Sequence, residues 1–164
     1  VVDGLSVGAS YSSDGENDAG STAYGATYTG IEGLTLSFGK GSDNSAKNVD
    51  KDQTIMKLSY AYGPVTVGYS NNDYDHTSAN SDQEVKSMSI AYTLTDQISL
   101  SYGEETIEKT GKSSDIEVEG VTASYTSGGM TLDLKSVEAT NVDYSNTAAN
   151  NDNEMWKIAL TFAF

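Results

Sequence analysis

The sequence is dominated by a two-residue alternation of apolar and polar side chains, which is clearest near the C-terminal end of the chain. From Trp156 to Phe164 every second side chain is large and apolar, and those between are small or polar. A period of two is that of a β-strand with one apolar face. The same alternation predicts ten strands, centred on residues 5–11, 24–28, 34–38, 56–62, 65–69, 88–92, 98–102, 121–125, 130–134 and 154–164.

Two valines do not fit this alternation. Val118 and Val137 are apolar but fall in the polar phase of their strands. An extra residue in one strand reverses its phase. We therefore expect a β-bulge or a strand end near each valine.

The connections between the predicted strands alternate between short and long. Tight turns are expected at 30–33, 63–64, 95–96 and 128–129, and the pattern repeats every 29 to 33 residues. Long polar loops are expected at 13–21, 42–53, 72–84, 104–116 and 138–153. Short turns at one end and long hydrophilic loops at the other are typical of up-and-down transmembrane barrels, whereas a Greek-key sandwich mixes connection lengths at both ends.

The face opposite the apolar one consists mainly of glycine, alanine, serine and threonine. A narrow barrel of eight to ten strands must fill its interior with side chains, and these residues are too small to do so. A space lined with hydroxyl groups holds water. The sequence therefore predicts an all-β, antiparallel up-and-down transmembrane barrel with a wide, wet lumen, of which the ten strands form only a part.

Aromatic residues support this assignment of faces. They occupy the apolar phase at two levels, one beside the tight turns and one nearer the long loops. Amphipathic rings collect in this way at the two boundaries of a membrane. The first set is Tyr28, Tyr62, Tyr92 and Tyr125, and the second is Tyr11, Phe38, Tyr69 and Tyr102.

Composition narrows the classes of function. The 164 residues carry 24 acidic groups against nine lysines and no arginine, a net charge of −15, which disfavours nucleic acid as a partner. Cysteine is absent, so the chain has neither disulfides nor thiolate metal sites. No apolar run is long enough for a membrane-spanning helix, and no secretory signal peptide precedes the first strand, so we expect a mature chain or a fragment.

The repeated Gly-Leu-x-Leu/Val-x-Tyr hairpins, the acidic loops and the terminal Phe164 resemble a proteobacterial general porin. The resemblance implies a sixteen-stranded, usually trimeric outer-membrane channel for small hydrophilic solutes. Residues 1–164 would then be the C-terminal ten strands of one barrel domain, without the first six strands and the constriction loop. The resemblance also implies contact with outer-membrane lipid and lipopolysaccharide, and a terminal signal for the barrel-assembly machinery formed by Trp156, Ile158, Leu160, Phe162 and Phe164.

Few charged residues fall in the polar phase of the predicted strands, and we expect them to line the pore. They are Lys57, Asp133, Lys135 and Lys157. A charge facing lipid at the membrane midplane costs roughly 2–4 kcal/mol, so their restriction to this phase supports the assignment of faces. Alternatively, they only pair with one another across strands.

Neither catalysis nor a bound cofactor is expected. His76 is the only histidine and lies in a predicted loop beside acidic residues. A solvent-exposed histidine is a simpler explanation for it than the catalytic histidine of a protease at the barrel rim. Residues 14–18 and 150–154 offer hard oxygen ligands without the spacing of an EF-hand, so we expect no metal site, although their carboxylates could share divalent ions with lipopolysaccharide. Besides a porin, two functions remain open: a small barrel serving as an adhesin or anchor, and a soluble secreted β-protein.

Overall fold

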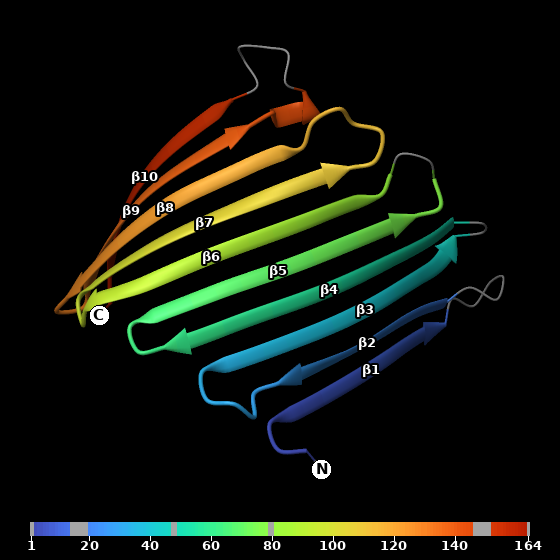
Figure 1. Ribbon diagram of the computed structural model, residues 1–164, viewed down its shortest axis with the longest axis horizontal. Coiled ribbons are helices and arrows are strands. Elements are labelled where there is room, and N and C mark those ends of the chain that lie inside the picture. The colour runs from blue at the N-terminus through green and yellow to red at the C-terminus, as the bar shows by residue number, and fades with distance from the viewer. Residues whose placement is uncertain (1, 14–19, 47–48, 79–80, 146–151, 164) are drawn as a thin grey trace.

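The computed structural model describes residues 2–13, 20–46, 49–78, 81–145 and 152–163, and they form one antiparallel β-sheet (Figure 1). Each strand pairs with its neighbours in sequence, which is an up-and-down meander. The strands are β1 (Leu5–Ser13), β2 (Gly20–Tyr28), β3 (Leu34–Ala46), β4 (Val49–Tyr62), β5 (Val65–His76), β6 (Gln83–Thr95), β7 (Ile98–Lys109), β8 (Ile116–Ser127), β9 (Met130–Thr140) and β10 (Asn153–Phe162), with one short 3-10 helix, η1 (Val142–Tyr144), before β10. The ten predicted strands are confirmed.

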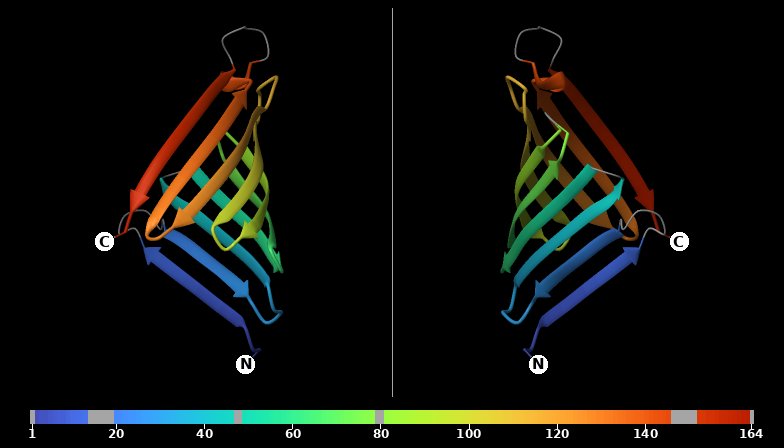
Figure 2. Two further views of the ribbon diagram at one scale, coloured as in Figure 1. Left: turned by 90° about the vertical axis from the view of Figure 1, so that its left-hand side faces the viewer. Right: turned by 90° about the vertical axis from the view of Figure 1, so that its right-hand side faces the viewer.

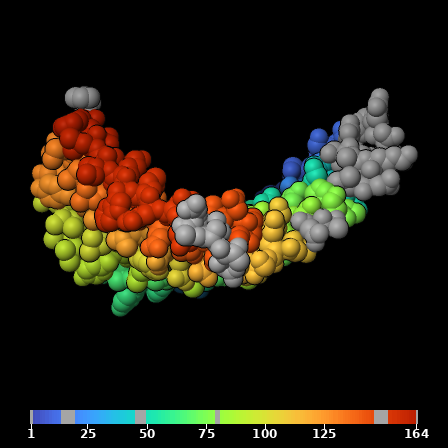
Figure 3. Space-filling view, turned by 90° about the horizontal axis from the view of Figure 1, so that it is seen from above, coloured from blue at the N-terminus to red at the C-terminus, as the bar shows by residue number. Residues whose placement is uncertain are grey.

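The sheet is strongly curved and open. Figure 2 shows its strands twisted around a common axis, and Figure 3 shows the sheet from above as a trough with one concave side. Among the described residues, β1 and β10 each pair with one strand only and not with each other. The fold is therefore a segment of a barrel wall, in agreement with the prediction that the ten strands are part of a larger barrel.

The predicted tight turns are confirmed. Two residues join β4 to β5, and two join β8 to β9. The second pair is Gly128 and Gly129, with φ of 57° and 83°. Positive φ at both central residues is what a short hairpin turn of matching twist requires, and glycine adopts it without steric cost. At the β6–β7 turn the Thr95 hydroxyl accepts a hydrogen bond from the backbone N–H of Gln97 (3.2 Å).

The predicted long loops are wrong in extent, because the strands continue into them. The β3 and β4 strands run as far as Ala46 and Val49, and β5 ends only at His76. The β7 strand likewise continues to Lys109. Many of the residues involved have low strand propensity, yet their backbone groups gain ladder hydrogen bonds.

Of the two alternatives predicted near Val118 and Val137, the β-bulge is wrong, whereas a strand end does lie close to each, since β8 begins at Ile116 and β9 ends at Thr140. The register of β8 with β9 is continuous, and Val118 and Val137 lie opposite Ala139 and Gly120 respectively. Both valines simply stand on the polar face. Register shifts occur elsewhere, between Asp43 and Ala46 and next to the β6–β7 turn.

Candidate functional site

The outward face of the sheet is an apolar band that no other part of the described chain covers. One cross-strand row runs through Leu34, Tyr60, Val67, Ile90, Tyr102, Val121, Ser136 and Trp156. All of its side chains except those of Leu34 and Ser136, which are half-buried, are exposed, as are those of Val7 (76%) and Ile158 (75%). No residue in the described part of the chain is buried. Because soluble monomers rarely expose apolar patches of more than a few hundred Å², this band identifies a surface that contacts another apolar phase.

Above the apolar band, in the strand ends remote from the tight turns, the outward face becomes charged. Lys86 donates to Glu108 (2.9 Å) and forms an ion pair with Glu84 (2.9 Å), while the Asn71 amide donates to Glu84 (2.9 Å). The hydrogen bond from Lys86 holds the pKa of the Glu84 carboxyl below its usual range. The carboxylates of Glu108 and Glu84 together raise the pKa of Lys86. Partial burial, with Asp75 nearby, raises the pKa of Asp73.

Four glutamates lie directly opposite one another in a second outward row, one from each of the last four strands. This row, which we call the glutamate row, consists of Glu104, Glu119, Glu138 and Glu154. Aromatic residues at the edge of the band bind it: the Tyr102 hydroxyl donates to Glu119 (2.9 Å) and the Trp156 ring N–H donates to Glu154 (2.6 Å). We call the outward face from this row to the strand ends remote from the tight turns the charged zone. It begins directly beside the apolar band.

The inward face consists mainly of small residues, some of which are connected by hydroxyl hydrogen bonds. Thr27 and Ser37 lie 3.2 Å apart through their hydroxyl oxygens, and Thr126 and Thr131 3.1 Å apart. These side chains project too little from the sheet to fill the trough. The face can therefore bind water and polar solutes, but it cannot form an apolar core.

The predicted pore residues share this inward face but lie in two places. Lys57 stands between Ser37 and Ser70 on β4. Lys135 and Lys157 lie directly opposite each other on β9 and β10. Asp133, two residues before Lys135, accepts a short hydrogen bond from the Ser124 hydroxyl.

Further charged residues of the inward phase were missed because they lie in segments predicted as loops. They are Asp43, Lys51, Glu105 and Lys109. The alternation itself, continued past the apolar band, would have revealed them.

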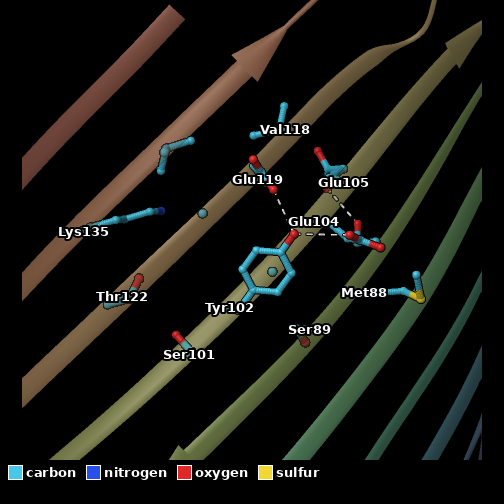
Figure 4. Close-up of a pocket in the computed structure, with 14 residues that line it drawn as sticks. Met88, Ser89, Ser101, Tyr102, Glu104, Glu105, Val118, Glu119, Thr122 and Lys135 are labelled. Carbon is cyan, nitrogen blue, oxygen red and sulfur yellow. Dashed lines mark hydrogen bonds between the residues drawn. The ribbon is translucent and has the colours of Figure 1, made fainter.

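A hollow of 390 Å³ lies in the inward wall between β6 and β9. Its floor is the directly opposed pair Gly103 and Gly120, and most of its lining residues belong to the inward phase. Figure 4 shows Lys135 extending from β9 toward β8, the strand that carries Thr122. The Ser87 hydroxyl donates to Glu105 (2.8 Å) at the rim.

The residues of the predicted assembly signal alternate as expected along β10. Trp156, Ile158, Leu160 and Phe162 point to the apolar side, and Phe164 lies outside the described residues.

His76 is the last residue of β5 rather than a loop residue, and its ring Nδ1 accepts a hydrogen bond from the Ser78 N–H (2.8 Å). Residues 14–18 and 150–151 lie outside the described residues. Among the residues that are described, no three His, Cys, Asp or Glu side chains are grouped so that they could hold a metal ion.

Comparison with known proteins shows which proteins this sheet resembles. The structure contains, in its described part, no helix long and apolar enough to cross a membrane. It matches a solved porin structure, refined at 1.8 Å, with a TM-score of 0.69 and 17% identity over all of this chain and 59% of that one, a likeness of fold. A search of curated protein sequences finds no match.

The chain spans less than two thirds of the solved porin chain that it resembles. Residues 1–132 match the sequence family described as Gram-negative porin, which is most of the chain. The sheet is therefore a wall segment of a bacterial outer-membrane β-barrel, and the chain belongs to the Gram-negative porin family.

Proposed function

We propose that this sheet is part of the wall of a water-filled channel through which small hydrophilic solutes and ions diffuse passively. The observation that carries the proposal is the division of its two faces. Large apolar side chains are exposed on one face, and glycine, serine and threonine line the other. Lipid would contact the first face and water the second, as in a porin wall.

A diffusion channel accounts for the small inward residues better than an anchor or adhesin does. A barrel that only holds a protein in the membrane packs its interior with large side chains, because an unfilled lumen stabilises nothing. Here the inward face leaves the lumen open. The inward-facing charges, including Lys57, Asp133, Lys135 and Lys157, then bias which ions enter.

The unpaired edges of β1 and β10 support the proposal that residues 1–164 are one part of a larger barrel domain, and the family resemblance favours its C-terminal part. An edge strand inside a membrane leaves backbone N–H and C=O groups without partners, and this is costly in a medium that contains no water. Strands outside this chain would close the sheet, and a barrel of sixteen strands agrees with its 59% coverage of the solved porin. The family resemblance favours a homotrimer of such barrels.

Partners follow from the two faces and from the charge. The apolar band suits outer-membrane lipid, and the charged zone above it lies at the level of lipopolysaccharide head groups. The alternating apolar residues of β10, continued by Phe164, suit recognition by the barrel-assembly machinery. The net charge of −15 argues against nucleic acid as a partner.

The test is reconstitution of the full-length protein into planar bilayers and liposomes. We expect stepwise current increases of constant size that scale with salt concentration, and liposome swelling that falls as the size of an added sugar rises. Folded protein that inserts but conducts nothing would indicate an anchor or adhesin. Protein that stays monodisperse without detergent would indicate a soluble β-protein.

A further inference from the structure

Four side chains capable of donating hydrogen bonds lie side by side on the inward wall. Ser101, Thr122, Lys135 and Lys157 are successive direct partners across β7, β8, β9 and β10. Neighbouring strands are about 4.8 Å apart, so two hydroxyls and two ammonium groups form one continuous row, which we call the donor row.

In the described part of the chain, neither lysine of the donor row is paired with an acidic side chain. Within the part of the chain that the structure describes, no carboxylate oxygen lies within 4.0 Å of either ammonium nitrogen. The closest acid along β9 is Asp133, whose carboxylate is bound by Ser124 in the next row toward the turn. Like charges directly opposite each other on a sheet are destabilising, so an anion held between Lys135 and Lys157 would relieve a repulsion that the described residues leave uncompensated.

The 390 Å³ hollow adjoins the donor row and has room for the rest of a solute whose charged group lies at the lysines. Gly103 and Gly120 form its floor one row from Thr122 and Lys135, so a solute can approach the backbone there. Val118 and Val137 provide apolar contacts, and the Glu105 carboxylate provides an acceptor at the far rim. The volume falls within the range of roughly 300–1,000 Å³ common for small-molecule sites.

We propose that this part of the wall binds a hydroxylated solute that carries a phosphate monoester. The phosphate lies between Lys135 and Lys157, which act as point charges, and the Thr122 hydroxyl donates to it. The hydroxylated body lies over Gly103 and Gly120, with Glu105 accepting from a hydroxyl group. This inference rests on the proposed function, because it requires the inward face to border the water of a channel.

Single-channel recording of the full-length protein in dilute potassium chloride tests the inference. The probes are glucose 6-phosphate, inorganic phosphate and glucose. We expect glucose 6-phosphate to reduce the current in a saturable way, inorganic phosphate to act at higher concentration, and glucose to have no saturable effect. The paired change Lys135→Gln and Lys157→Gln, which removes both charges but keeps polar side chains, should weaken the glucose 6-phosphate effect by about tenfold, since two exposed ion pairs are lost.

Lys57→Gln is the matched control, because it removes one inward ammonium group from a different part of the wall. It should leave the affinity for glucose 6-phosphate nearly unchanged, and the single changes at Lys135 and Lys157 should each weaken binding. The inference is overturned if glucose 6-phosphate acts no more strongly than glucose, or if Lys57→Gln weakens it as much as the single changes do. Channels that conduct normally but show either result would leave the proposed function intact, whereas a protein without any conductance would overturn both.

Discussion

At the scale of single residues, the phase of a side chain in the two-residue period determines which medium it meets. On β10, Ile158 and Leu160 are 75% and 53% exposed on the apolar side, while Ala159 between them faces inward opposite Asp133. More than half of the surface of each side chain is therefore left uncovered by the described chain. Most of their stabilising effect has to come from transfer into lipid.

This division predicts opposite outcomes for the same substitution at adjacent positions. Leu160→Lys should destabilise the folded protein by roughly 2–4 kcal/mol, because it places a charge in the hydrocarbon layer. Ala159→Lys should be tolerated, since its ammonium group would meet water. Urea unfolding in liposomes measures both, and equal free energies of unfolding for the two variants would contradict the assignment of faces.

A second residue-scale prediction concerns Lys86, which neutralises carboxylates above the apolar band. The lowered pKa of Glu84 means that its pairing stabilises the protein above the ordinary glutamate pKa and loses this effect as pH falls. Asp73, with its pKa raised, has the opposite sign and favours the folded state more as pH falls. Lys86→Gln should therefore lower stability at pH 7, with the loss shrinking toward pH 4 and in high salt.

Lys40→Gln provides the control for Lys86, because Lys40 is also on the outward phase, opposite Thr54 and Tyr24. Unfolding midpoints between pH 4 and 8 would be compared for the two variants. A loss at Lys86→Gln that is independent of pH would show that its stem packing, rather than its charge, is what matters.

At the scale of elements, the sequence predicted strands well wherever hydrophobic alternation is strong and poorly where it fades. The ten strands and four tight turns were predictable, since apolar faces and Gly-Gly turns have strong local signals. Strand ends such as Asp73–His76 were not predictable. There both faces carry polar side chains, so the sequence shows no alternation between apolar and polar residues. For the same reason the inward position of Glu105 was not predicted. That Lys135 lies opposite Lys157 could not be predicted either, because it depends on the register between two strands.

The glutamate row is a consequence of that register and gives an element-scale prediction. Glu138 stands between Glu119 and Glu154 and, unlike them, accepts no hydrogen bond from Tyr102 or Trp156. Glu138→Gln should therefore stabilise the protein at low salt by roughly 0.2–1 kcal/mol, by removing like-charge repulsion between neighbouring strands. Glu32→Gln, in a tight turn, is the control, and a destabilised Glu138→Gln protein would indicate that the row contributes favourable interactions.

At the scale of the whole molecule, charge is distributed unevenly along the strands. The charged zone and the segments beyond it hold most of the 24 acidic residues, whereas Lys135 and Lys157 lie deeper in the wall. The acidic residues attract cations, whereas the two lysines attract anions. Which of them dominates depends on screening, whose length is about 8 Å at 0.15 M salt and about 30 Å at 0.01 M.

We therefore predict a modest preference for cations at low salt that fades as salt rises, because the acidic mouth acts over a longer range than the two lysines when screening is weak. Reversal potentials across a salt gradient measure this preference directly. A preference for anions at low salt would show that the lumen lysines, or residues outside this chain, set the selectivity.

The central claim is that one face of this sheet meets lipid and the other meets channel water. The chain contains no cysteine, so single cysteines can be placed at successive positions of β10 and labelled in liposomes with a membrane-impermeant thiol reagent. Cysteine in place of Lys157, Ala159 or Thr161 should react fast, and cysteine in place of Ile158, Leu160 or Phe162 should stay protected until the protein is unfolded. Uniform labelling along the strand, or the reverse alternation, would contradict the account.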